Sequence, residues 1–316
     1  MSGIKSKKIL IVISHSLGEL DVLLPLIAGV KSKYDTDIKM IFSVNKVYRK
    51  FKTNHFYQFC VKKLDIKTIK CQLPNKFDYR SKFFRYRIVL FIVKIYFLAI
   101  DILKFPYIFY NLMWADIYMH EFSNQLSSTK YLHWGSSFLK KKILCYIHGH
   151  AINSSSKFIQ RMDFKSNVTL LNFHEHNRRA LEKYGFNKQH IMGYPKFFSE
   201  WKNLTKYYIS SISNRKEKAV IIFSRPIHPY YMDKNKYKKL LLNSFKVIRL
   251  KYNTIPIIIK PHPREELTEI KKILSESNQR NYFFSTEDAS VVSQNAILAI
   301  SFWTSAILAS LANNVP

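Results

Sequence analysis

Short apolar runs alternate along the chain with longer stretches in which apolar residues recur at helical spacing. Runs of this length that are rich in β-branched residues predict strands, and the stretches between them predict helices. In the first part of the chain the predicted strands are residues 7–14, 37–44, 115–122, 141–149 and 168–173, and the segment 190–195 closes the series. Helices are predicted over 20–33, over most of 47–113 with breaks near Pro74 and Pro106, and over 176–185. This alternation is typical of parallel α/β units.

A polar, basic segment at residues 199–217 lacks a core pattern, and a second series of runs begins after it. Strands are predicted at 218–224, 255–263, 281–285 and 296–301, and helices at 234–252, 265–275 and 304–312. We therefore predict an α/β protein of two Rossmann-like domains, 1–200 and 201–316, whose parallel sheets face a cleft. A doubly wound domain continues from such a helix into another strand, so we expect the second domain to be incomplete at its C-terminus.

The composition is that of a globular protein with a large positive charge. Hydrophobic residues make up 47% of the chain, which excludes a disordered protein. Lys and Arg outnumber Asp and Glu by 51 to 21, a formal charge of +30, and all of the excess lies before residue 251. Such a field attracts nucleic acid, an acidic membrane surface or phosphorylated substrates. The alternative is compositional, because a chain rich in Lys, Ile and Asn can follow from an AT-rich genome.

The sequence shows neither a disulfide framework nor a targeting segment. Cys60, Cys71 and Cys145 are far apart and form no CxxC pair, which fits a reducing cytosol. The N-terminal apolar run is too short for a secretory signal and predicts a strand instead. Residues 88–100 are apolar except for Lys94, and this run is shorter than the about 20 residues that a membrane span needs. This stretch is either a buried helix or one that lies on a membrane, since basic residues flank it.

Ligand sites of open parallel sheets lie at the carboxyl ends of the strands, so the residues after each predicted strand are the candidates. In the first domain, Glu19 and Asp21 stand near the start of a helix, and Glu19 is a candidate base, although the helix dipole alone favours acidic residues there. His148 and His150 follow another strand around a glycine and form a candidate general-base pair.

The second domain carries potential phosphate ligands at its strand ends. Arg225 follows the first strand, and a guanidinium is a bidentate donor to phosphate. Lys260, His262 and Arg264 follow an all-apolar strand, and the two prolines between them hold the segment extended. Burying such cations without an anion is unfavourable, so the segment favours a phosphate ligand.

Hydroxyl side chains follow the last predicted strand. Ser301, Thr304 and Ser305 stand at a strand-to-helix junction, where they can cap the helix. With the free amides of that helix they can also bind a pyrophosphate, together with Lys260 and His262 from a strand that we expect to be adjacent. No GxGxxG or GxxxxGK[ST] motif is present, and no ligand spacing around His148 indicates a metal.

The KPHP segment at 260–263, the motif SxxTSAILASLA at 301–312 and GYPKF at 193–197 together resemble bacterial GT-B glycosyltransferases that build capsule and other surface polysaccharides. The pattern is most similar to capsule-type sugar transferases and CDP-glycerol glycerophosphotransferase-like enzymes, and it covers about half of the chain. The sequence departs from the latter in having HGH where they have an HGT-type element, in lacking the DYSS form, and in ending before their C-terminal helices.

This resemblance implies that the first domain takes the acceptor and the second takes the nucleotide-activated donor. It implies further that His262 contacts the donor phosphate, that the three hydroxyls line the pyrophosphate, and that His148 is the base, with His150 competing for this role. The implied reaction is transfer from a nucleotide sugar or CDP-polyol to a hydroxyl of a polysaccharide or lipid-linked acceptor. Cations and helix amides would stabilise the leaving phosphate, so we expect neither a metal nor a separate cofactor. We expect a cytoplasmic protein, with residues 83–112 as a candidate contact to the anionic inner membrane surface.

Alternatives from other classes stay open. A nonhydrolysing UDP-sugar 2-epimerase shares this architecture but needs carboxylates in the cleft, for which Glu19, Asp21 and Glu175 are the early candidates. A basic non-enzyme that binds nucleic acid or a membrane would use the charge directly. A nucleic-acid partner is not expected, because no binding module is readable and the basic residues are scattered.

Overall fold

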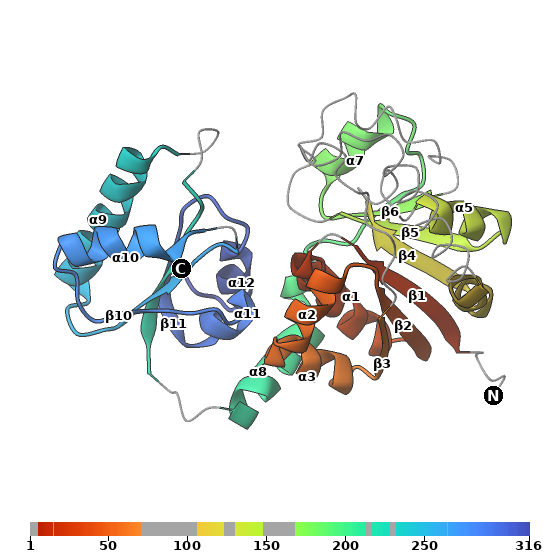
Figure 1. Ribbon diagram of the computed structural model, residues 1–316, viewed down its shortest axis with the longest axis horizontal. Coiled ribbons are helices and arrows are strands. Elements are labelled where there is room, and N and C mark those ends of the chain that lie inside the picture. The colour runs from red at the N-terminus through yellow and green to blue at the C-terminus, as the bar shows by residue number, and fades with distance from the viewer. Residues whose placement is uncertain are drawn as a thin grey trace, which may run out of the picture. The chain divides into compact units, whose positions relative to one another are not determined.

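The computed structural model describes residues 6–14, 16–70, 106–122, 130–147, 168–212, 217–227, 232–263 and 265–316 (Figure 1). The chain divides into two compact units, Met1–Pro195 and Lys196–Pro316. The division falls ahead of the predicted boundary at residue 200, because the helix that follows it, α8 (Ser199–Ile212), packs with the second unit through α11.

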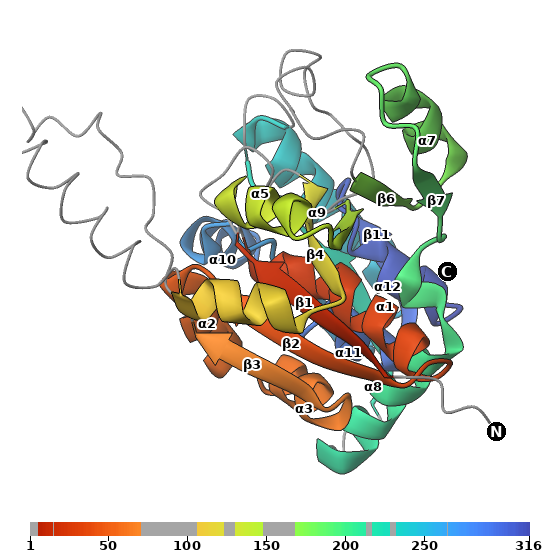
Figure 2. The same cartoon turned by 90° about the vertical axis from the view of Figure 1, so that its right-hand side faces the viewer.

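The first unit is built on a seven-stranded sheet in the order β3-β2-β1-β4-β5-β6-β7, in which every pairing is parallel. Figure 2 shows β3, β2, β1 and β4 side by side in this order. The strands are β1 (Lys7–Ile13), β2 (Thr36–Phe42), β3 (Ile66–Lys70), β4 (Ile117–Glu121), β5 (Lys142–Tyr146), β6 (Val168–Asn172) and β7 (Gln189–Ile191). The helices with described bounds are α1 (Leu20–Lys31), α2 (Asn45–Lys52), α3 (His55–Lys63), α5 (Lys130–Phe138) and α7 (Glu175–Glu182), with short 3-10 turns η1 (Leu17–Glu19) and η4 (Pro195–Phe197). Residues 106–114 are also helical.

Strand β3 corrects the prediction of helix over most of 47–113, because it lies ahead of the first expected break near Pro74. The chain leaves α3 through Asp65, whose φ is 45°, and pairs with β2 from Ile66 onward. This strand lies at the edge of the sheet, where Lys67 and Lys70 are exposed. Its polar positions therefore resemble the outer face of a helix in the sequence. Residues 71–105, with the apolar stretch 88–100 and most of the expected membrane contact, lie outside the described residues.

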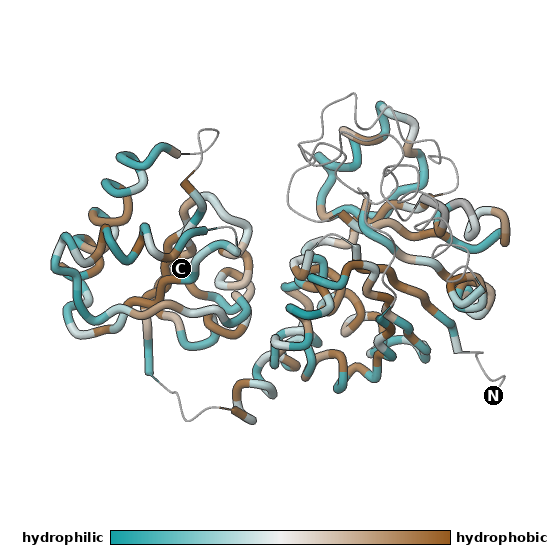
Figure 3. Tube along the Cα trace, in the orientation of Figure 1, coloured by the Kyte–Doolittle hydropathy of each residue, from teal (hydrophilic) through white to brown (hydrophobic). Residues whose placement is uncertain are grey.

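The second unit contains a four-stranded parallel sheet in the order β10-β9-β8-β11. All five residues of β8 are buried because helices cover both faces of the sheet. Figure 1 shows α9 and α10 on one side and α11 and α12 on the other, and Figure 3 shows the hydrophobic strands inside. The elements are β8 (Ala219–Phe223), α9 (Lys234–Lys251), β9 (Ile257–Lys260), α10 (Leu267–Glu276), β10 (Tyr282–Phe284), α11 (Ala289–Val292), η5 (Ser293–Asn295), β11 (Ala296–Ser301) and α12 (Ile307–Ala312).

Helix α8 occupies most of the segment that the sequence predicts to be a junction without a core pattern. Trp201, Thr205 and Tyr208 form a narrow buried stripe on this helix. The Trp201 indole N–H donates to Ser290 Oγ in α11 at 3.2 Å. The sequence pattern did not indicate this packed helix, because one large tryptophan supplies the buried contact that several smaller apolar residues would otherwise provide.

No helix among the described residues is long and apolar enough to span a membrane.

In both sheets the chain adds strands first on one side of the first strand and then on the other side. In the first unit the chain builds β2 and β3 on one side of β1 and then returns to place β4 on the other side. In the second unit β9 and β10 lie on one side of β8 and β11 on the other. Such switch points open a crevice at the carboxyl ends of the two central strands, which is where ligands bind in open α/β sheets.

A buried polar cluster joins β4, β5 and α5. We assign the proton of His120 to Nδ1, which donates to the Glu121 carbonyl at 2.8 Å and leaves Nε2 as an acceptor. That nitrogen lies 3.1 Å from Nδ1 of His133 and 3.2 Å from Sγ of Cys145. Burial lowers the pKa of His120 to about 4 and that of His133 to about 3, and the His120 charge adds to the effect on His133. Both rings are therefore neutral in the folded protein near neutral pH.

We expect the free energy of unfolding to fall as the pH is lowered from about 6.5 toward the folded-state pKa values. Both histidines bind a proton near pH 6.5 in the unfolded chain but stay neutral when folded. The unfolded state then binds more protons, and acid favours it by up to about 1.4 kcal/mol per pH unit for each histidine. Urea unfolding at several pH values in this range measures the slope.

The variant His133→Leu removes one titrating group and should lower that slope. His190 is an exposed histidine, and His190→Asn serves as the control that should leave the slope unchanged. Equal slopes for the wild type and His133→Leu would show that the pH dependence arises elsewhere.

Candidate active site

The carboxyl edge of the second sheet brings together residues from three strands. In the ladder, Phe223 at the end of β8 pairs with Lys260 on one side and with Ser301 on the other. Lys260 and Ser301 therefore stand at the same level of the sheet, with β8 between them. The prediction from the sequence that their strands are adjacent is wrong, because β11 pairs with β8 and not with β9.

The loop after β9 is held by a carboxylate that the sequence analysis did not single out. Glu265 Oε2 accepts the backbone N–H of His262 at 2.8 Å, and Glu265 Oε1 accepts the hydroxyl of Tyr237 at 2.8 Å and that of Ser224. Burial raises the pKa of Tyr237 well above its ordinary value, and the Glu265 charge adds to this, so the phenol stays a donor. The network joins the ends of β8 and β9 through α9 and positions the half-buried Lys260 and His262 at the edge.

Arg225 connects β8 to the loop after β11. Its guanidinium donates to the Trp303 carbonyl, across the switch point of the sheet. Trp303 has a φ of 59°, in the left-handed region that a bulky side chain rarely adopts, and its side chain is 79% exposed. Because strained backbone concentrates at functional sites, this outlier beside a switch point makes the loop a candidate for ligand contact.

The hydroxyl motif forms a turn and not a helix cap. Ser301 Oγ accepts the Thr304 N–H at 3.1 Å and donates to the Thr304 carbonyl at 3.1 Å. Thr304 Oγ1 accepts the Ala306 N–H, and α12 begins only at Ile307, three residues later than predicted. The expectation that these side chains cap the helix is therefore wrong, since the residue before α12 is Ala306 and no side chain caps it. Ser305 is exposed at the turn.

In the first unit, Glu19 lies at the carboxyl edge of the sheet but is fully buried. Its Oε1 accepts the N–H groups of Ser14 and Ser16 at 3.1 Å each, and its Oε2 accepts the Tyr146 hydroxyl at 2.8 Å. Burial and the Glu19 charge raise the pKa of Tyr146 well above its ordinary value. The carboxylate thus joins the turn after β1 to the end of β5, a positioning contact, and its catalytic role stays a prediction.

The remaining predicted site residues have different outcomes. His148, His150 and Arg264 lie outside the described residues, so their roles stay predictions; the last described residue before the two histidines, Ile147, directly follows the end of β5. Asp21, a candidate carboxylate of the epimerase alternative, accepts the Tyr57 hydroxyl. Glu175, another, is bound by Arg178 and Arg179 on its own helix, and these hydrogen bonds lower its pKa to about 2.

Four residues near the two edges were not identified from the sequence. Glu265 stands three positions after His262, a spacing that allows a carboxylate to accept a loop amide. Trp303 is an aromatic residue inside a hydroxyl-rich turn. His120 and the buried Glu121 end β4, which lies beside β1 at the switch point of the first sheet. The sequence predicted strand β4 but not that it lies beside β1, so nothing in the sequence pattern indicated that His120 and Glu121 are at a switch point.

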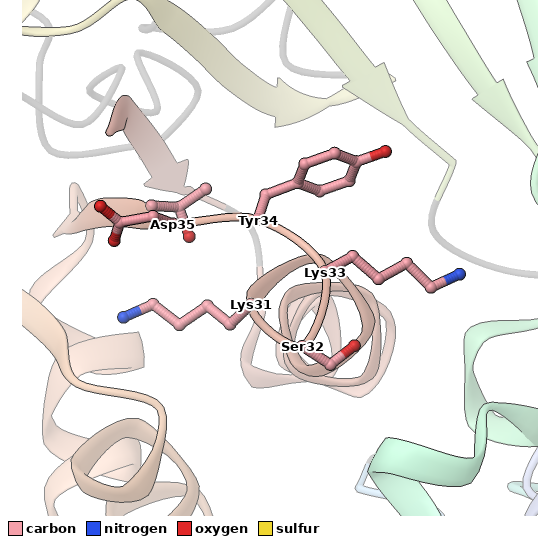
Figure 4. A pocket seen from close by; sticks show the side chains of 6 residues that line it. Lys31, Ser32, Lys33, Tyr34 and Asp35 are labelled. Atoms are coloured by element: carbon pink, nitrogen blue, oxygen red, sulfur yellow. The ribbon is translucent and has the colours of Figure 1, made fainter. Parts of the chain in front are cut away.

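A shallow pocket of about 380 Å³ lies at the opposite edge of the first sheet, where α1 leads into β2 (Figure 4). Figure 4 shows Lys31, Lys33 and Tyr34 pointing in different directions, so these side chains do not converge on a ligand. The pocket is at the amino end of β2 and is not part of the candidate site. Within the described part of the chain, no three His, Cys, Asp or Glu side chains are grouped so as to hold a metal ion.

Comparisons with known proteins show the architecture. No protein-family model and no curated protein matches the sequence. Among solved structures, a UDP-N-acetylglucosamine 2-epimerase from Rickettsia bellii is 18% identical with a TM-score of 0.54, and the match covers 98% of this chain and 78% of that one. The chain has the GT-B fold.

Two further structures match this GT-B chain over 98% of its length. A glycosyltransferase from Rickettsia africae is 14% identical with a TM-score of 0.53, covering 78% of that chain. The UDP-GlcNAc 2-epimerase of Methanocaldococcus jannaschii, solved with UDP-GlcNAc and UDP, is 14% identical with a TM-score of 0.52, covering 82% of that chain. The fold is thus shared by transferases and epimerases, and it does not choose between them.

We expect Glu265→Gln to destabilise the protein by about 1–3 kcal/mol, because an amide cannot accept from all three donors and leaves one buried donor unpaired. The adjacent Glu266 is exposed, and Glu266→Gln is the matched control, expected to change stability by less than about 0.5 kcal/mol. Thermal and urea unfolding measure both. Equal stability of the two variants would contradict the role of Glu265 in holding the loop.

Proposed function

We propose that this chain is a GT-B transferase that moves a glycosyl or polyol-phosphate group from a nucleotide-activated donor to a hydroxyl of a surface polysaccharide or lipid-linked acceptor. The observation that carries the proposal is the carboxyl edge of the second sheet. There Arg225 contacts the loop of the hydroxyl turn through the Trp303 carbonyl, and Lys260 stands at the same level of the sheet as Ser301 with β8 between them. His262 follows Lys260 in the loop after β9. Cations and hydroxyls at this place suit the phosphates of a nucleotide diphosphate donor.

In this proposal the second unit binds the donor. The charge that develops on the leaving nucleotide phosphate is neutralised by Lys260, His262 and Arg225. These side chains take the place that a metal ion can have in stabilising such a charge. The exposed hydroxyl of Ser305 donates to the same phosphate. Trp303 offers a flat, exposed aromatic face to the nucleobase or the transferred group beside them.

The first unit supplies the acceptor side. A histidine after β5, His148 or His150, takes the proton of the acceptor hydroxyl as the new bond to the transferred group forms and the bond to the nucleotide phosphate breaks. Glu19 and Tyr146 hold the neighbouring turn in place. The donor is a nucleotide sugar or a CDP-polyol, and no separate cofactor is needed for this chemistry.

The second candidate function is a UDP-sugar 2-epimerase. It is favoured by the epimerases among the similar solved structures. Its carboxylate candidates from the sequence are engaged in internal contacts, by Tyr146 for Glu19, Tyr57 for Asp21 and two arginines for Glu175. Glu121 at the end of β4 is the further carboxylate near the first switch point.

We expect one nucleotide diphosphate, or its sugar or polyol conjugate, to raise the melting temperature of the wild type in a panel that includes CMP, CDP, UDP and GDP. A ligand that binds only the folded state stabilises it by about 2.7 kcal/mol at 100 times its Kd. His262→Ala, Lys260→Ala and Ser305→Ala should each raise the Kd of that ligand about tenfold and so reduce the rise in melting temperature, because each removes a donor to the phosphate. Lys272→Ala, at an exposed lysine of α10, is the matched control for Lys260→Ala.

The nucleotide that binds is then supplied as its sugar conjugate, and the products are followed by NMR. Release of free nucleotide that depends on an added acceptor supports transfer. Conversion of the bound sugar to its C2 epimer would replace the transferase proposal with the epimerase. Equal shifts for the wild type and for all three variants would place the nucleotide outside the proposed site.

A further inference from the structure

Helix α9 presents an outward strip that combines aliphatic and basic side chains. Its inner face packs Tyr237, Leu241, Phe245 and Ile248 into the core. On the outer face Leu240 is 37% exposed, Val247 63% and Leu250 80%. These three positions recur over ten residues, a length of about 15 Å along one side of the helix. None of the three belongs to the hydrophobic core of the described residues, so this second apolar row is separate from the inner face.

The same strip carries positive charge without acidic residues. The sequence of α9 contains seven Lys and Arg residues and no Asp or Glu. The carboxylates of neighbouring segments are bound to Lys234, Lys236 and Lys238. Lys239, Lys246 and Lys251 are exposed beside the aliphatic row, and the salt bridges of the described residues do not include them.

Arg249 does not belong to this strip. Its guanidinium donates to the carbonyls of Ile255 at 2.7 Å and Asn281 at 2.8 Å, and to further carbonyls of the loops before β9 and β10. Its charge is thus used inside the unit, whereas the three lysines reach solvent. The outer face therefore has a defined composition: three aliphatic side chains with three ammonium groups around them.

We propose that this outer face of α9 docks on an anionic lipid membrane. Aliphatic side chains of an interfacial helix enter the boundary between headgroups and acyl chains, while lysines extend toward anionic headgroups. Nucleic acid would use the lysines equally well but gains nothing from exposed Val247 and Leu250. The aliphatic row is thus the feature that selects a membrane as the partner. The proposal does not depend on the proposed function.

The test is co-sedimentation of the whole chain with vesicles of phosphatidylcholine alone and of phosphatidylcholine containing phosphatidylglycerol. The wild type should partition to the anionic vesicles and only weakly to the neutral ones. The charge-neutral variant Val247→Ser/Leu250→Ser should reduce partitioning at least fivefold. Lys239→Gln/Lys246→Gln/Lys251→Gln should reduce it more than tenfold, since each lysine near an anionic surface contributes about fivefold.

The matched control is Tyr34→Ser/Leu311→Ser, which removes two exposed apolar side chains from other surfaces and should partition like the wild type. Unfolding temperatures and circular dichroism show that all variants are folded. The proposal is overturned if the wild type does not bind anionic vesicles, or if the α9 serine variant binds them like the control. It is also overturned if only binding to a DNA oligonucleotide responds to the lysine substitutions.

Discussion

The parallel direction of all strands is the constraint on which the rest of this structure depends. Because every pairing in both sheets is parallel, the carboxyl ends of the strands meet at one edge of each sheet. The order in which strands are added also changes side at β1 and at β8, so the carboxyl edge of each sheet has a switch point. Arg225 and the turn of Ser301 are separated by about 75 residues of sequence and still meet there, because β8 and β11 pair.

Each unit stabilises its edge with one glutamate and one buried tyrosine. Glu19 accepts two backbone amides of the turn after β1 and the hydroxyl of Tyr146. Glu265 accepts the amide of His262 and the hydroxyl of Tyr237. In both, burial raises the pKa of the phenol, so the tyrosine stays protonated and donates to the carboxylate. In the second unit this network holds the loop that carries Lys260 and His262 at the carboxyl edge of the sheet.

The fold and the chemistry of this chain carry separate information. Similar solved structures include transferases and epimerases, so the GT-B architecture by itself is neutral between them. The total charge of +30 likewise does not distinguish between possible partners, but the positions of the charged residues do. On α9 the lysines surround exposed aliphatic side chains, whereas at the edge of the second sheet the cations border a turn of hydroxyls. These two arrangements favour different partners, a lipid surface and a phosphorylated small molecule.

The apolar runs of the sequence determined most strands and the parallel class, because burial on both faces requires continuous β-branched residues. They also located the candidate phosphate ligands, since Pro261 follows the end of β9 at Lys260. Local patterns could not show β3, whose lysines face solvent at the sheet edge, or α8, which buries a single large tryptophan. The order of strands, which places β8 between Lys260 and Ser301, was decided by the tertiary structure alone. So was the role of Glu265, since a side chain acquires its hydrogen-bond partners only when distant segments pack together.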